Sequence, residues 1–171
     1  IDSSSPDAPA GPQARPPGLP SGLATVRLPM HPSISDLLAV ARRAARAASA
    51  VCLGVLEEAP AAPDAMAKLG KEPVTVADYG SQAVILAAVA AAFPGHGVIA
   101  EEGAAHFAEH AGAAGSEQIV RLVGRALGRS VSLDEVLGWI DHRGAAGPFT
   151  WVIDPIDGTK GFLRRDQFAV A

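Results

Sequence analysis

The stretch from Trp151 to Arg164, WVIDPIDGTKGFLR, is the part of the sequence around which the rest is organised. An apolar, β-prone run leads two carboxylates, Asp154 and Asp157, into a turn. Pro155 restricts the residue before it to extended conformations, so we expect the strand to continue up to the first carboxylate. Gly158 allows the backbone to come close to a ligand, and the N–H groups after it can face an anion. Two hard oxygen ligands beside such amides suit a divalent cation, such as Mg²⁺, that bridges to a phosphate.

The composition limits the classes of protein that need to be considered. A chain of 171 residues, 49% of them hydrophobic, can bury a sizeable core. The formal net charge of −4 argues against a non-specific binder of nucleic-acid polymers, which would normally be basic. The single cysteine, Cys52, excludes an internal disulfide framework and fits a reducing compartment. No run reaches the ~18 apolar residues of a membrane span. We therefore expect no membrane partner, no secretion, and a location in the cytoplasm or in an organelle such as a plastid or mitochondrion.

Residues 1–32 differ in composition from the rest of the chain, because they hold eight of its fourteen prolines. Such a segment cannot bury enough apolar surface to order itself, so we expect a disordered leader or linker. The end of an organelle transit peptide is the alternative. Asp2 and Asp7 weaken that alternative, since transit peptides are poor in acidic residues.

Two helices and a strand are expected in the first half of the remaining chain. A helix begins near Ser33 or Ser35, either of which can cap it, and its apolar residues recur at helical spacing. A second helix is expected over about Ala77–Phe93, and Thr75 or Asp78 at its start could act as no more than a cap. Val98–Ala100 then indicates a short apolar strand.

Two acids, Glu101 and Glu102, follow that strand. Acids at the end of a buried strand lie where ligands of a site are often found, although an exposed strand end explains them equally well. Gly103–Gly115 is rich in Ala, Gly and His and indicates a mobile loop. Its segment HFAEH, at residues 106–110, matches the H-x-x-E-H pattern of one zinc peptidase group. That pattern needs a long helix and a third ligand, so we expect ordinary surface histidines instead.

Glu117–Leu127 and Ser132–Ile140 indicate short amphipathic helices, the second with a capping box between Ser132 and Glu135. Helices packed with short, antiparallel strands predict an α+β layered domain rather than a repeated βαβ arrangement.

Three ordered motifs resemble those of the inositol monophosphatase-like, lithium-sensitive phosphatases: PVTVADYGSQ at 73–82, VIAEE at 98–102 and IDPIDGTKGFLR at 153–164. The continuation KGFLR-x-x-QFAVA points to the 3'(2'),5'-bisphosphate nucleotidase branch, since the plain monophosphatases read T-N-F after the motif. The resemblance runs from about Ser35 to Ala171. It implies a layered α/β sandwich of the sugar phosphatase type, of which residues 33–171 would be the N-terminal lobe, with helices packed on an antiparallel sheet.

The resemblance also implies a metal site. Glu101, Asp154 and Asp157 would bind Mg²⁺, with the backbone carbonyl of Ile156 as a further ligand. Carboxylates are the ligands that Mg²⁺ prefers, and the cation would neutralise a phosphate ester and lower the pKa of the attacking water.

Catalytic and substrate-binding roles are implied in the same way. Asp78 and Thr159 would activate the water, because the hydroxyl can accept the water's proton while it passes its own to the carboxylate. The backbone N–H groups of Gly158 and Thr159 would bind the phosphate. Haloacid-dehalogenase-type phosphatases are an alternative hypothesis, since they use the motif D-x-D-G-T, in which the first aspartate is the nucleophile. The sequence does not fit this hypothesis, because the residue two positions before Asp157 is Pro155.

The expected activity is therefore Mg²⁺-dependent, Li⁺-inhibitable removal of the 3'-phosphate of adenosine 3',5'-bisphosphate, which gives AMP and phosphate. The sulfated relative of this nucleotide and inositol phosphates are further candidate substrates. An inositol phosphate phosphatase of the same superfamily and a non-catalytic metal-binding fragment remain as alternatives. The family's last metal-binding aspartate lies in a later W-D-x-A-A-G type motif, in a second lobe. We therefore expect the chain to be a truncated N-terminal lobe that is inactive on its own.

Overall fold

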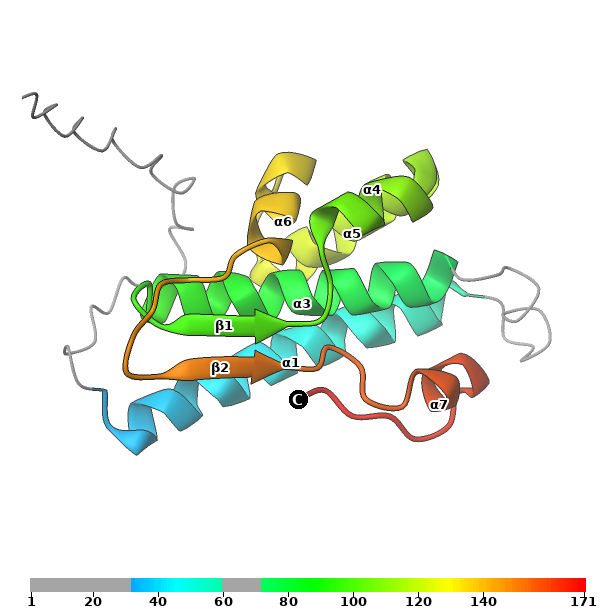
Figure 1. Ribbon diagram of the computed structural model, residues 1–171. Coiled ribbons are helices and arrows are strands. Elements are labelled where there is room, and N and C mark those ends of the chain that lie inside the picture. The colour runs from blue at the N-terminus through cyan, green and yellow to red at the C-terminus, as the bar shows by residue number, and fades with distance from the viewer. Residues whose placement is uncertain (1–31, 60–71) are drawn as a thin grey trace, which may run out of the picture.

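A computed structural model describes residues 32–59 and 72–171. The expected leader, apart from Pro32, lies outside these residues. The described elements, in chain order, are α1 (Ile34–Glu58), α3 (Glu72–Ala92), β1 (Gly97–Ala100), α4 (Ala104–His110), α5 (Gly112–Leu127), α6 (Leu133–Ile140), β2 (Thr150–Ile153) and α7 (Thr159–Arg164) (Figure 1). None of the helices in these two segments is long and apolar enough to cross a membrane.

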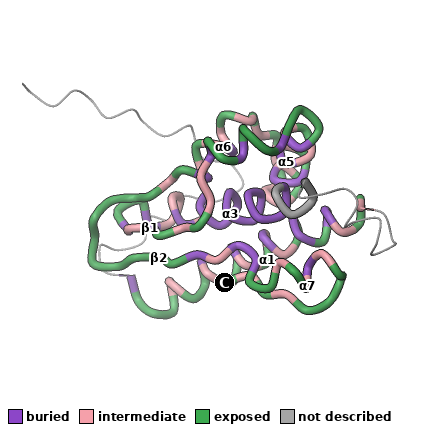
Figure 2. Tube along the Cα trace, turned by 45° about the vertical axis from the view of Figure 1, so that its right-hand side comes forward, coloured by how far each residue is buried: buried purple, intermediate pink, exposed green. Residues whose placement is uncertain are grey.

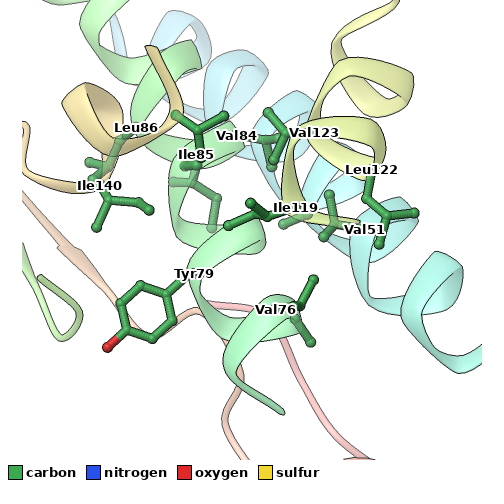
Figure 3. Packing of buried hydrophobic residues seen from close by; sticks show 14 of the residues in the cluster. Val51, Val76, Tyr79, Val84, Ile85, Leu86, Ile119, Leu122, Val123 and Ile140 are labelled. Carbon is green, nitrogen blue, oxygen red and sulfur yellow. The ribbon is translucent and has the colours of Figure 1, made fainter. Parts of the chain in front are cut away.

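Helix α3 is the centre of the molecule. Every residue from Val76 to Ala87 is buried, which is the pattern of a helix covered on all sides (Figure 2). It packs along α1 and is also in contact with α5 and α6. The core between α1, α3 and α5 contains Val51, Ile119 and Leu122, which are almost completely inaccessible to solvent (Figure 3).

The helix starts that the sequence indicated by capping are confirmed at two places. Ser33 caps α1 through a capping box with Asp36, and Ser132 caps α6 through one with Glu135. In each box the serine hydroxyl accepts from the backbone N–H three residues on, while the acid accepts from the serine's own N–H.

The second helix begins earlier than the sequence indicated, at Glu72 rather than Ala77. Pro73 does not prevent this, because the first turn of a helix leaves backbone N–H groups without intrahelical partners and therefore tolerates proline. Thr75 and Asp78 consequently lie inside the helix, and neither is its cap. The capping explanation for Asp78 is wrong.

The segment Gly103–Gly115 was expected to be a mobile loop, and this expectation is also wrong. It forms α4 and the first turn of α5. Alanine has the highest helix propensity, and Ala104, Phe107 and Ala111 recur on one face and are buried. The glycines that indicated a loop lie near the helix ends; Gly112 adopts a positive φ of 59° where α4 gives way to α5.

The two strands are parallel, so the expectation of an antiparallel sheet is wrong for the described residues. Val98 pairs with Trp151, Ile99 with Val152, and Ala100 with Ile153. Because α4, α5 and α6 lie between the strands, the chain can return to the end from which β1 started, as a parallel pair requires. Ile99 and Val152 are register partners and both are exposed, so one face of this pair is open in the described part of the chain.

An aromatic cluster fixes the register where the strands begin. The indole Nε1 of Trp151 donates to Nδ1 of the buried His96 at 3.1 Å. The His96 ring stacks on Phe93 with 4.6 Å between the ring centroids. Since Trp151 belongs to β2 and His96 directly precedes β1, this contact ties the two strand starts together. A slip of one residue would reverse the faces of the side chains and break it.

The close approach of α1 to α3 generates a prediction. A Cβ at Gly80 would lie 2.8 Å from Cγ1 of Val51, a stiff side chain in a helix, whereas a Cβ at Gly138 would meet nothing within 4 Å. Both glycines lie in helices, so alanine improves helix propensity equally at the two positions. We expect Gly138→Ala to be neutral or to stabilise by up to ~1 kcal/mol, and Gly80→Ala to destabilise by roughly 1–3 kcal/mol. Urea unfolding measures both, and equal behaviour of the two variants would show that the packing is looser than described.

Candidate active site

The candidate site lies at the carboxyl ends of the two parallel strands. Ala100 and Ile153 are the last register pair, so Glu101 and Asp154 leave the sheet side by side. Glu101 is exposed, and Asp154 is half-buried. The parallel sheet therefore brings together two of the predicted metal ligands, which are far apart in the sequence.

The turn after β2 is held by the last residues of the chain. The N–H of Asp154 donates to the Ala171 carbonyl at 2.9 Å, and the N–H of Ala171 donates back at 3.0 Å. Asp157 and Ala169 exchange a second pair of hydrogen bonds and form an antiparallel bridge. The last residues of the chain therefore form a short antiparallel pairing with the turn. It fixes the backbone of the turn, while the Asp157 side chain is exposed.

The turn then enters α7 through Gly158, whose φ of 91° is one that other residues rarely adopt. The Thr159 hydroxyl donates to the carbonyl of Ile156 at 3.3 Å. Phe162 is fully buried and anchors the short helix in the core. Gly161 packs directly on the following turn, since a Cβ there would lie 2.0 Å from the Gln167 carbonyl oxygen.

The side chain of Arg165 links α7 to the end of α1. Arg165 closes α7 in a left-handed conformation, with φ of 58°. Its guanidinium donates to the carbonyls of Leu56 and Ala59, at 2.7 and 3.0 Å. The last turn of α1 contains no basic residue of its own, so Arg165 supplies the positive charge that the C-terminus of a helix favours.

Asp78 faces these acids from α3. Its side chain is buried, and no residue that the structure describes donates a hydrogen bond to its carboxylate. Burial is the main cause that raises the pKa of Asp78, and the negative charges of Glu102, Glu101 and Asp154 contribute to the same shift. Together these effects raise the pKa to about 7. Four carboxylates therefore lie close enough to one another to disfavour their common ionisation.

The predicted catalytic pair consists of Asp78 and Thr159. Within residues 32–59 and 72–171, no hydrogen bond joins Asp78 to Thr159. The Thr159 hydroxyl instead donates to the carbonyl of Ile156. That carbonyl is itself one of the predicted metal ligands. A relay between Asp78 and Thr159 stays a prediction.

The H-x-x-E-H segment lies on α4. The Tyr79 hydroxyl contacts Nδ1 of His106, and Nδ1 of His110 lies 2.8 Å from the His106 carbonyl. Tyr79 is buried beside the Glu102 carboxylate, and burial and this carboxylate raise the pKa of its hydroxyl. The first histidine is thus tied to a buried tyrosine rather than directed at a third ligand.

The site suits a divalent cation in two respects: its negative charge and the type of its donor atoms. Among the described residues, no three His, Cys, Asp or Glu side chains are gathered as a ready ligand set. After burial, the charges of the neighbouring acids also raise the pKa of Asp78, and a divalent cation would relieve this repulsion. Carboxylate and carbonyl oxygens are suitable donors for Mg²⁺. Rotation of the exposed Glu101 and Asp157 side chains would be needed to complete a ligand shell.

Comparison with known proteins settles the family. Residues 33–171 match the inositol monophosphatase family. The chain belongs to that family. The resemblance read from the three motifs is therefore confirmed, and the mixed arrangement of helices and strands agrees with the family's α/β fold.

Several curated relatives carry the same name. The 3'(2'),5'-bisphosphate nucleotidase 1 of Arabidopsis thaliana is 38% identical over 146 residues, which are 78% of this chain and 41% of the relative. The 3'(2'),5'-bisphosphate nucleotidase of Schizosaccharomyces pombe is 33% identical over 78% of this chain and 40% of its own length. That of Emericella nidulans is 41% identical over 61% of this chain and 33% of its own. The chain thus spans about two fifths or less of the length of these relatives.

Asp78 leads to a prediction about stability. Its pKa rises from 3.8 to about 7 on folding, so the folded state holds the proton more tightly than the unfolded state does. The folded chain should therefore lose stability as pH rises from about 4 to about 7, by a total of about 4 kcal/mol at 1.36 kcal/mol per unit. Asp78→Asn removes this loss. In EDTA we expect the variant to be more stable than the wild type at pH 8 and the difference to shrink toward pH 4.

Urea unfolding at both pH values measures this difference. Asp166→Asn, at an exposed position, is the matched control and should follow the wild type. An Asp78→Asn variant that is no more stable than the wild type at pH 8 would show that the Asp78 carboxylate is well solvated.

Proposed function

We propose that this chain carries the core of a divalent-cation-dependent phosphatase that removes the 3'-phosphate of adenosine 3',5'-bisphosphate and yields AMP and phosphate. The observation that supports it most is the meeting of Glu101, Asp154 and buried Asp78 at one end of a parallel strand pair. The shared name of the relatives supports the substrate class. We further propose that residues 33–171 act as one lobe of a longer catalytic domain, since the relatives extend well beyond the matched segment.

Four groups of this chain would hold Mg²⁺: the carboxylates of Glu101, Asp154 and Asp157 and the carbonyl of Ile156. When bound, the cation would neutralise the phosphate oxygens and make the attacking water more acidic. The backbone pairing of Asp154 with Ala171 and of Asp157 with Ala169 holds the turn in place, so that mainly side-chain rotations remain. Such preorganisation matters because positioning and charge neutralisation provide most of the catalysis in phosphoryl transfer.

Asp78 would accept the proton that the water gives up, with the Thr159 hydroxyl between them. A buried carboxylate whose pKa is about 7 without a cation is a far better proton acceptor than an ordinary aspartate. For the relay, the Thr159 hydroxyl has to turn from the Ile156 carbonyl toward Asp78. That turn frees the same carbonyl as a ligand, so the two proposed roles are compatible.

The first N–H groups of α7 would bind the transferred phosphate. Gly158 occupies the N-cap position of this helix and Thr159 is its first residue, and the first N–H groups of any helix have no partner within it. Gly158 also has no side chain to stand between the backbone and a ligand.

Single changes at the proposed ligands test the function. We expect Asp154→Asn and Asp157→Asn each to lower kcat/KM for adenosine 3',5'-bisphosphate by more than ~100-fold, since even outer partners of metal ligands are typically worth 10–100-fold. Glu109→Gln is the matched control, because it removes the same charge from an exposed position on α4. Phosphate release is measured with and without Mg²⁺, in a chain of the relatives' length that contains these residues. Unchanged turnover in both aspartate variants would exclude this metal site.

The same assay identifies the substrate and tests the short chain. Adenosine 3',5'-bisphosphate, its sulfated relative and inositol 1,4-bisphosphate are compared, each with and without Li⁺. We expect the adenosine bisphosphate to be hydrolysed with the highest kcat/KM and Li⁺ to inhibit. We also expect the 171-residue chain to release phosphate negligibly, because one lobe provides only part of the proposed site. A preference for the inositol phosphate would support the alternative substrate class within the family.

A further inference from the structure

Gln82 is a fully buried polar residue of α3 that the proposed chemistry does not use. Its side chain makes three hydrogen bonds. Nε2 donates to the carbonyls of Glu102, at 2.8 Å, and Ile140, at 3.0 Å. Oε1 accepts from the N–H of Glu102 at 2.9 Å. Both N–H groups and the oxygen of the amide therefore have partners.

These bonds hold the backbone of Glu102 from both sides. The register of the strand pair ends at Ala100 and Ile153, so β2 offers no partners to the residue after Glu101. A single amide takes the place of a neighbouring strand there: it accepts from the N–H of Glu102 and donates to its carbonyl. Arg143 adds a further hydrogen bond to that carbonyl, at 2.8 Å. Loss of the amide would leave the Glu102 N–H without this partner.

Asp78 and Gln82 are four residues apart on α3 and therefore lie on the same face, one turn from each other. One helical turn thus carries the buried carboxylate of the site and the amide that holds the residue next to Glu101. The motif DYGSQ at residues 78–82 places both at a spacing that a rigid, fully buried helix cannot alter.

We propose that Gln82 is a positioning residue, which sets the place of the Glu101 carboxylate relative to Asp78 by holding the backbone of Glu102. The inference rests on the proposed function, since it gives Glu101 the role of a metal ligand. It assigns a role to a residue that touches neither substrate nor cation. A merely structural role would predict lower stability when the amide is lost, with unchanged affinity for a cation.

Gln82→Met separates the two roles, because methionine has nearly the same length and shape and makes none of the three hydrogen bonds. Ser81→Ala is the matched control. Ser81 is equally buried on α3, but its hydroxyl lies against Cys52 and the Ala48 carbonyl of α1, away from Glu102. Two quantities are measured on a chain of the relatives' length that contains these residues: the dissociation constant of Mn²⁺, followed by electron paramagnetic resonance with Mg²⁺ competition, and the hydrogen exchange of the Glu102 amide.

We expect Gln82→Met to raise the dissociation constants of Mn²⁺ and Mg²⁺ about 10-fold or more, which is the usual effect of removing an outer partner of a ligand. The Glu102 amide should also exchange faster, while Ser81→Ala changes the affinity less than about 2-fold even where it lowers Tm equally. If Gln82→Met unfolds the chain, Gln82→Asn takes its place, because it keeps the amide but is one methylene too short to reach. Failure of both variants to fold would show a role in folding alone and would overturn the proposal.

Two other results would also overturn it, and they are distinguishable. Tight Mn²⁺ binding by the wild type with unchanged affinity in Gln82→Met would remove the positioning role and leave the proposed function intact. A folded wild type with a protected Glu102 amide and no Mn²⁺ binding would remove the metal site itself, and the positioning role with it.

Discussion

The parallel, in-register pairing of β1 with β2 is the constraint on which the candidate site depends. It makes Glu101 and Asp154 neighbours although more than fifty residues separate them in the sequence. An antiparallel pairing would have sent the acids that follow the two strands to opposite ends of the sheet. The aromatic contacts of His96 with Phe93 and Trp151 fix the register at the other end of the strands. The geometry of the charged end is thus set by packing at the uncharged end.

The acids that meet at this end are unfavourable for the folded chain by themselves. Asp78 lies in the most buried element of the structure and faces other carboxylates, so its proton is held far more tightly than that of an exposed aspartate. Strain of this kind is expected at functional sites, where stability is lost in exchange for reactivity. The backbone around the acids is by contrast well satisfied, through the pairing of Asp154 and Asp157 with the last residues and through the Gln82 amide.

Local signals in the sequence were sufficient for much of the fold. Ser33 and Ser132 indicate helix starts in the sequence, because the hydrogen bonds of a capping box form within four consecutive residues. The positions of both strands follow from short apolar runs bounded by turn residues. The relative direction of the two strands cannot be predicted in this way, because it depends on how α4, α5 and α6 return the chain. No short stretch of the sequence contains that information. In Gly103–Gly115 the glycines predict a loop, whereas the helix propensity of alanine and the burial of Phe107 favour a helix.

The candidate site, like the fold, can be predicted from the sequence only in part. The motifs named Glu101, Asp154 and Asp157 through resemblance, and the structure brings the first two together. The contact between Thr159 and Ile156 could not be read from the sequence, since it depends on the rotamer of one hydroxyl. The role of Gln82 cannot be predicted from the motif that contains it, because its partners, Glu102 and Ile140, lie 20 and 58 residues further along the chain.

The two halves of the site also differ in how far apart in the chain their contacts are. Asp154 and Asp157 are fastened by Ala171 and Ala169, which are close in sequence, so this turn closes a short loop. The approach of Glu101 to Asp154 depends instead on the pairing of β1 with β2, which three helices separate in the sequence. Contacts between distant residues form more slowly than local ones. We therefore expect the 154–171 loop to take shape early in folding as a small unit of its own, and the acidic cluster to be among the last features to assemble. Its mutual repulsion then arises only after the surrounding helices are in place to contain it.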